Sequence, residues 1–137
     1  MIDRAHLEAL FGAREIEQLS GGPAGNADAD ALVDDAIQRA TEEAQSRLSI
    51  RYTVPIADPT VELMERVADL ARARLYTTKR PDYVQERADD ARSYLDSAAR
   101  GRREIVGLTP RAQTNAGIGL RGRADRTFTR ESLDDYR

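Results

Sequence analysis

The side chains of residues 21–36 carry oxygen atoms at a spacing that resembles a calcium-binding loop. Positions 1, 3, 5 and 9 of an EF-hand loop would be filled by Asn26, Asp28, Asp30 and Asp34. Such a loop also needs a glycine at position 6 and a bidentate glutamate at position 12, where this sequence has Ala31 and Ile37. Because the sharp turn and the bidentate ligand are missing, the stretch is predicted to start a helix, with Asp28 or Asp30 as N-cap.

Other residue types that carry out chemistry are scarce or lack a motif. His6 is the single histidine and has no carboxylate pattern around it, and the chain has no cysteine, which excludes disulfides, zinc–thiolate sites and thiol nucleophiles. The glycine-rich residues 117–122 do not follow a strand and open a helix, as a phosphate-binding loop would. Acidic pairs such as 42–43 and 89–90 are expected on solvated helix faces. We therefore predict no catalytic, metal or cofactor-binding residues, and no enzyme activity.

The composition favours closely packed helices. Of the 137 residues, 33% are charged and 5% aromatic, with no tryptophan, so a core must be built from Ala, Leu, Val and Ile. No apolar run approaches the roughly 20 residues of a membrane span, and the N-terminal residues lack the apolar segment of an export signal. We expect a single-domain intracellular protein that does not contact membranes.

Three long helices are predicted from apolar residues spaced three or four apart. The first covers about residues 30–50, with a stripe of Val33, Ile37, Ala40, Ala44 and Leu48. The second begins at Pro59 after an Asp58 N-cap and continues to about Thr78. The third runs from Pro81 to a glycine stop at Gly101, with a stripe of Val84, Ala88, Ala91, Leu95 and Ala98.

Two shorter helices are predicted before them, one capped by Asp3 and stopped by Gly12 and one over residues 14–19. The predicted fold is all-α: a compact bundle of three long helices plus short N-terminal helices, residues 1–106, followed by an extended C-terminal arm, residues 107–137. A short strand-like alternation lies at residues 126–133 of the arm. Because the arm has no core of its own, it is either a disordered end or a segment that docks on another surface.

The charge is distributed unevenly along the chain. The net charge is −3, but residues 1–100 carry 13 basic and 19 acidic side chains, whereas residues 101–137 carry 8 and 5. An acidic body repels DNA phosphates, and the arginines of the arm are diluted by acids, so sequence-specific DNA binding is not indicated.

The order of several short motifs resembles the Mu-type neck protein family of tailed phages. The first long helix ends in Arg-Tyr-x-x-Pro-Ile, residues 51–56; the second contains Ala-Arg-x-x-Leu-Tyr, residues 71–76. The third matches an Arg-x-x-Asp-Ala-x-x-Tyr-Leu pattern, residues 87–95, and the end of the chain, Arg126 to Leu133, is similar to the closing segment of the family. The similarity covers nearly the whole chain, and the arginine-rich residues 101–120 depart from it.

The resemblance implies a head–tail connector subunit. Copies would form a ring, usually of twelve, beneath the portal protein and around the passing DNA, in the neck of the virion after assembly in the host cytoplasm. The expected partners are other copies, the portal and a tail or stopper protein. The arm would bind a neighbour or the portal through Arg126, Phe128, Arg130, Leu133 and Tyr136, and the acidic body would line the channel through Asp34, Asp35, Glu42 and Glu43.

Three alternatives remain open at this point. The protein could be a tail-proximal stopper or tail-completion protein rather than a portal-proximal adaptor. A small helical DNA-binding protein would show an affinity for duplex DNA that falls steeply with salt. A small hydrolase with helix-borne carboxylates would place two acids with raised pKa values in one pocket.

Overall fold

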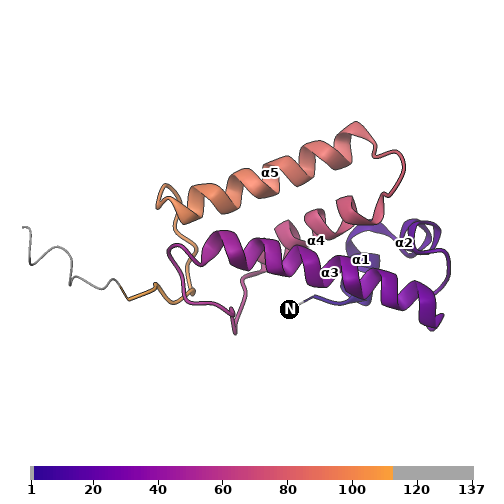
Figure 1. Ribbon diagram of the computed structural model, residues 1–137, viewed down its shortest axis with the longest axis horizontal. Coiled ribbons are helices and arrows are strands. Elements are labelled where there is room, and N and C mark those ends of the chain that lie inside the picture. Colours follow the sequence, from indigo (N-terminus) through magenta and orange to yellow (C-terminus); the bar gives the residue numbers. More distant parts are fainter. Residues whose placement is uncertain (1, 113–137) are drawn as a thin grey trace, which may run out of the picture.

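The computed structural model describes residues 2–112, and all regular elements in that range are helices (Figure 1). Two short helices, α1 (Arg4–Phe11) and α2 (Ala13–Ser20), precede three long ones. These are α3 (Ala27–Leu48), α4 (Val61–Leu75) and α5 (Asp82–Ala99). The predicted all-α bundle of three long helices with short N-terminal helices is confirmed.

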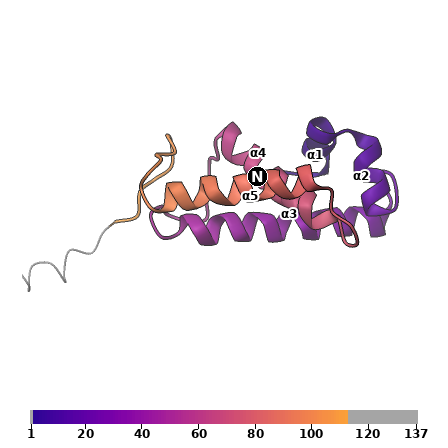
Figure 2. The same ribbon diagram turned by 90° about the horizontal axis from the view of Figure 1, so that it is seen from above.

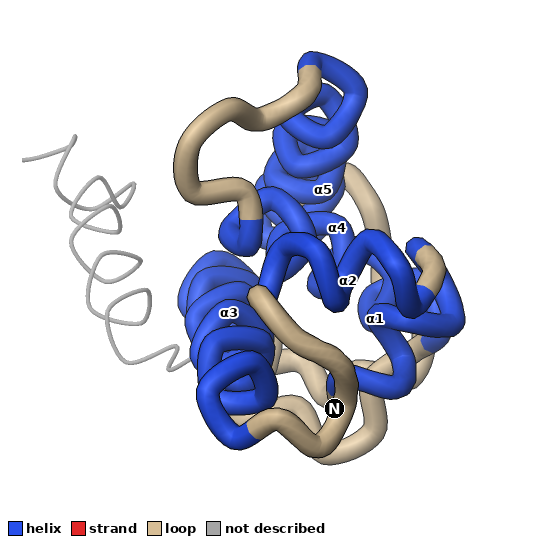
Figure 3. Tube along the Cα trace, turned by 90° about the vertical axis from the view of Figure 1, so that its right-hand side faces the viewer, coloured by secondary structure: helices blue, strands red, loops and turns tan. Residues whose placement is uncertain are grey.

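Among the long helices α3, α4 and α5, each runs antiparallel to the one before it, so α3 and α5 point in the same direction (Figures 1 and 2). Viewed end-on, α4 lies between α3 and α5, and α1 and α2 cover one side of α3 and α4 (Figure 3). The end of α3, the start of α4 and the end of α5 therefore meet at one end of the bundle, together with residues 100–112. The helices α1 and α2 lie toward the opposite end.

The predicted apolar stripes of α3 and α5 form the core. All ten stripe residues are buried, which confirms the helical periodicity read from the sequence. Eight alanines are buried on the two helices, namely Ala29, Ala36, Ala40, Ala44, Ala88, Ala91, Ala98 and Ala99. Small side chains at these seams let the helix axes approach closely, near the low end of the usual 8–10 Å.

Helix α4 is buried around most of its circumference. Every residue from Val67 to Ala73 is buried, including the charged Asp69 and Arg72. Leu63 and Leu75 are in the core, whereas Met64 is half-buried and Arg74 is exposed. A helix packed between two others needs more than one apolar stripe, which explains why periodicity alone described it least well.

Two predicted helix starts are wrong by a few residues. The N-cap of α3 is Asn26, not Asp28 or Asp30: its side-chain oxygen accepts hydrogen bonds from the amides of residues 28 and 29 at 3.1 and 3.2 Å. The N-cap of α4 is Thr60, not Asp58, because its hydroxyl accepts a bond from the amide of Leu63 at 3.2 Å. The predicted ends at about residue 50 for α3 and Thr78 for α4 also lie beyond the observed ends.

A buried arginine attaches α2 to α4. Arg72 donates to both carboxylate oxygens of Glu15 at 2.8–3.0 Å, and the hydroxyl of Tyr76 donates to Glu15 Oε1 at 2.6 Å. The Arg72 guanidinium also stacks on the ring of Phe11, 4.4 Å from its centroid. Burial and the hydrogen bond to Glu15 raise the pKa of Tyr76, so it stays protonated as a donor.

The residues that follow α5 turn back onto the connection between α3 and α4. Ile105 is buried, and its amide donates to the hydroxyl of Tyr52 at 3.2 Å. The amides of Thr53 and Arg111 donate to the carbonyls of Thr109 and Arg51, at 2.9 and 2.7 Å. Residues 107–111 of the predicted arm therefore lie against the body; the domain boundary after residue 106 remains a prediction.

We predict that Glu15→Ala destabilises the protein by roughly 3–5 kcal/mol, because it leaves a nearly buried guanidinium without its partner. Urea unfolding followed by circular dichroism at neutral pH measures the change. Glu17→Ala is the control, since Glu17 is an exposed acid of the same helix, and should change stability by less than about 0.5 kcal/mol. Equal effects of the two substitutions would contradict the proposed attachment.

Adjacent residues test whether the segment after α5 belongs to the core. Ile105 is 4% exposed and Val106 is 80% exposed. Ile105→Ala should lower the free energy of unfolding by about 2–4 kcal/mol, as expected for a truncated core side chain, and Val106→Ala by less than about 0.5 kcal/mol. Melting of both variants and the unchanged chain provides the comparison. A loss no larger for Ile105→Ala than for Val106→Ala would show that this segment is only loosely attached.

Candidate interaction site

The acidic stretch before α3 has a structural role. Asp30 Oδ1 accepts a hydrogen bond from Arg4 at 2.9 Å, and its Oδ2 accepts one from the amide of Gly25 at 3.0 Å. Arg4 is itself buried and also bonds Glu8 and the carbonyl of Gly22. These contacts, together with the Asn26 cap, confirm that the stretch starts a helix and joins it to α1.

The outward face of α3 carries the acidic residues predicted to line a channel. Asp34, Asp35 and Glu42 are exposed there. Asp35 pairs with Arg39 at 2.8 Å, but both side chains are more than half exposed, so the pair is worth little. These three acids give this helix face an excess of negative charge.

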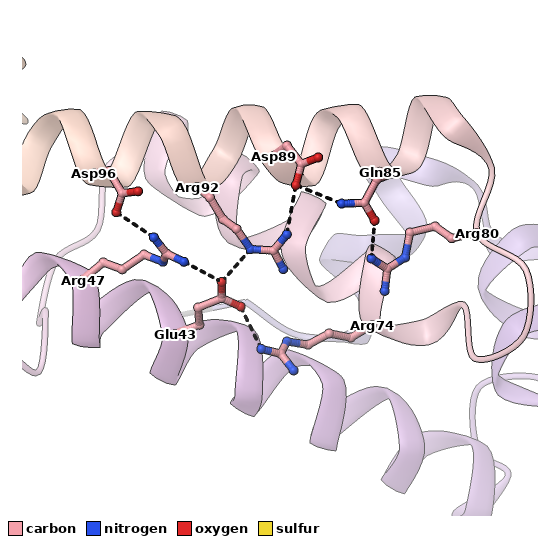
Figure 4. A network of polar contacts seen from close by, with 8 residues as sticks. All are labelled: Glu43, Arg47, Arg74, Arg80, Gln85, Asp89, Arg92 and Asp96. Carbon is pink, nitrogen blue, oxygen red and sulfur yellow. Dashed lines mark hydrogen bonds and ion pairs between the residues drawn. The ribbon is translucent and has the colours of Figure 1, made fainter.

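Glu43, the fourth predicted channel residue, lies instead at the centre of an ion-pair cluster between the long helices (Figure 4). Its carboxylate accepts hydrogen bonds from Arg92 of α5 at 2.8 Å and from Arg74 of α4 at 2.7 Å, with Arg47 of α3 3.5 Å away. Arg47 also bonds Asp96 of α5 at 2.6 Å. The cluster joins α3, α4 and α5 through one carboxylate.

Two opposing influences act on the pKa of Glu43. Burial raises it, but the hydrogen bonds from Arg92 and Arg74 outweigh burial, and the pKa is lowered overall. A carboxyl group with a lowered pKa in the folded state stabilises the fold above its unfolded pKa. That contribution is lost as the pH falls through the folded value.

A cleft of about 250 Å³ opens where α1, α4 and α5 meet. It is lined by Leu10, Phe11, Glu65, Arg66, Asp69 and Arg87. Asp69 is buried, and burial raises its pKa although Arg87, Arg66 and Arg72 act in the opposite direction. The cleft combines an apolar wall with two acids and two bases.

A second, more open cleft of about 230 Å³ surrounds Tyr94. The guanidinium groups of Arg66 and Arg103 lie 5.1 and 4.9 Å from the centroid of its ring. Arg103 also pairs with Glu62 at 3.4 Å, which holds the segment after α5 against the start of α4. This arrangement stabilises the position of that segment.

The sequence motifs correspond to these structural contacts. Arg72 and Tyr76 of the second motif are the partners of Glu15, and Arg87 of the third motif pairs with Asp69. The roles of Glu15 and Asp69 were missed, and the only signal for Asp69 was a charge within the apolar pattern of α4. The predicted arm residues Arg126, Phe128, Arg130, Leu133 and Tyr136, and the strand-like alternation, lie outside the described residues.

No helix between residues 2 and 112 combines the length and apolar content that crossing a bilayer requires. Within the same range, no group of three or more His, Asp and Glu side chains is arranged to hold a metal ion.

We predict that Glu43→Gln lowers the free energy of unfolding by about 1–3 kcal/mol at neutral pH, the range for a hydrogen bond to a charged group. The difference from the unchanged chain should shrink as the pH falls from neutral through the lowered pKa of folded Glu43, because the carboxyl is then protonated in both states. Urea unfolding across this pH range measures it. The neighbouring Glu42→Gln should have little effect at any pH, and a pH-independent loss in Glu43→Gln would exclude the ionised carboxylate as its cause.

A comparison with the sequence profiles of known families identifies the group to which these helices belong. The profile described as Bacteriophage Mu, Gp36 matches residues 2–120, which include all five helices. No curated protein matches the chain significantly. This match confirms the resemblance to a Mu-type phage protein. The chain belongs to the bacteriophage Mu Gp36 family.

Proposed function

We propose that this protein is a non-enzymatic structural subunit of the head–tail connector of a tailed phage or prophage. The observation that carries the proposal is the family match over residues 2–120. In this role several copies, twelve by the resemblance described above, form a ring beneath the portal and around the DNA channel. The protein is in the host cytoplasm during assembly and in the neck of the finished virion.

A ring subunit must keep its shape when neighbours and DNA exert force on it. The three long helices are joined by the Glu43 cluster, and α2 is joined to α4 by Glu15 and Arg72. Such hydrogen-bonded ion pairs fix the register between helices more strictly than alanine seams can. The fold therefore suits a rigid building unit.

The outward face of α3 suits a channel that lets DNA pass. Asp34, Asp35 and Glu42 would face the phosphates and repel them, which prevents adhesion. Glu43 is not included, because Arg92, Arg74 and Arg47 already surround its carboxylate. This restricts the channel-lining prediction to three of its four residues.

The hydrolase alternative is less well supported by the geometry. Glu65 and Asp69 line one cleft, but Arg66 and Arg87 line it with them. Burial raises the pKa of Asp69 although Arg87, Arg66 and Arg72 act in the opposite direction. Glu65, however, is exposed, so the cleft does not enclose the pair of buried acids that this alternative needs.

Electron microscopy of particles made without this protein tests the proposal. We expect filled heads without attached tails, and free tails beside them, with normal virions restored when the unchanged gene is supplied in trans. Normal virions in its absence would refute the connector role. Binding of the purified protein to portal-bearing heads supports the adaptor position, whereas binding to tails alone supports the stopper position.

A further inference from the structure

The cleft between α1, α4 and α5 contains a buried acid whose bonding is incomplete. The side chain of Asp69 is 9% exposed, and the one ion pair recorded for it among residues 2–112 is with Arg87 Nε, 3.8 Å away. That distance is too long for a hydrogen bond. Arg87 is 60% exposed, so it stays largely in solvent. Burial disfavours the charged form of this carboxylate, but its oxygens open to the cleft, because among residues 2–112 no Asp69 oxygen is fully buried without a partner. A donor entering the cleft would replace water at a carboxylate that is already largely desolvated.

The other groups in the cleft define what could enter. Leu10 and Phe11 provide an apolar wall, Glu65 lies one helical turn before Asp69, and Arg66 and Arg87 add positive charge. A complementary ligand would carry a large apolar side chain flanked by cations, with acids farther along. A short peptide segment can supply all three features.

The end of this chain has that composition. Residues 126–137 read Arg-Thr-Phe-Thr-Arg-Glu-Ser-Leu-Asp-Asp-Tyr-Arg. Phe128 matches the apolar wall, and the two flanking arginines match Asp69 and Glu65. The acids at 134 and 135 match Arg66 and Arg87. Charge-assisted hydrogen bonds between arginine and carboxylate are among the strongest contacts that a segment of this length can form.

The proposed ring, whose subunits must contact one another head to tail, selects a neighbour's cleft over the chain's own. Arg111 is bonded to Arg51, which follows the end of α3. That end of the bundle is opposite to the end near α1 and α2 (Figures 1 and 2), and α1 contributes Leu10 and Phe11 to the cleft. Residues 113–125 can span up to about 45 Å when extended. This exceeds the length of α3, about 33 Å for its 22 residues, so an adjacent copy is within reach.

We propose that the Asp69 cleft is a socket for residues 126–137 of a second copy of this chain. Arg130 or Arg126 bonds the Asp69 carboxylate, and Phe128 packs on Leu10 and Phe11. The inference rests on the proposed ring and adds the contact that would link its subunits. Each copy gives one segment and receives one, which is the head-to-tail contact that a closed ring requires.

Disulfide trapping in the full chain tests the socket, since the natural sequence has no cysteine. One variant carries Glu65→Cys at the cleft and another carries Thr129→Cys in the segment. Mixed and mildly oxidised at high protein concentration, they should give a heterodimer on a non-reducing gel. The matched control replaces Glu65→Cys by Gln38→Cys, an exposed position on α3, and should give about tenfold less product.

Substitutions of the acid itself give a second readout. Asp69→Asn, added to the Glu65→Cys chain, should lower the heterodimer yield about tenfold, the equivalent of one charged hydrogen bond. Asp90→Asn on the exposed face of α5 should leave the yield unchanged, and melting curves verify that both variants fold. Arg130→Glu in the Thr129→Cys chain should lower the yield as Asp69→Asn does.

Two outcomes would overturn the proposal. One is a heterodimer yield no higher than that of the Gln38→Cys control. The other is observed in a chain that carries both cysteines: an intrachain disulfide that persists on dilution, with no disulfide-linked dimer, would mean that the segment occupies its own cleft. Neither outcome affects the connector role, because that role is tested by particles lacking the protein.

Discussion

One carboxylate, that of Glu43, joins the three long helices of this protein. Its partners come from α3, α4 and α5, and two of them lie within 2.8 Å. The constraint arises from composition: with 5% aromatic residues and no tryptophan, the core combines Leu, Ile and Val with many alanines. The alanine seams fix the spacing of the helices but hardly their register. Directional hydrogen bonds between charged groups supply the missing specificity, although desolvation of the charges makes their net effect on stability modest.

This use of arginine inside the bundle also shapes its surface. Arg4, Arg72, Arg74 and Arg92 all turn toward acids that connect helices. These four arginines are engaged in pairs between helices, whereas Asp34 and Glu42 face solvent from α3. The pairs account for part of the basic charge of the body, and net charge alone would not have located the negative face of α3. A face that repels phosphate suits the proposed channel.

The parts of the fold that depend on periodicity could be predicted from the sequence, and those that depend on distant pairing could not. The stripes of α3 and α5 follow from three- and four-residue spacing, which is a local property. Glu15 and Arg72 are 57 residues apart, and no local pattern links them. Helix starts were misplaced because several capping residues compete within a few positions, and Asn26 and Thr60 form the bonds. Asp69 was overlooked because a charge on a helix is ordinarily exposed.

The contrast between Glu43 and Asp69 bears on how a subunit can be rigid and yet prepared for assembly. Both are carboxylates in the helical body, but cations lower the pKa of Glu43, whereas burial raises that of Asp69. The bonding around Glu43 is complete within one chain. Within residues 2–112, the cation that pairs with Asp69 is Arg87, which stays 3.8 Å away and largely in solvent. The Asp69 carboxylate costs free energy in the isolated subunit, and a donor from a neighbour would make association favourable. Association would not loosen the fold, because the contacts that hold the helices together are separate from the contact that would be completed on assembly.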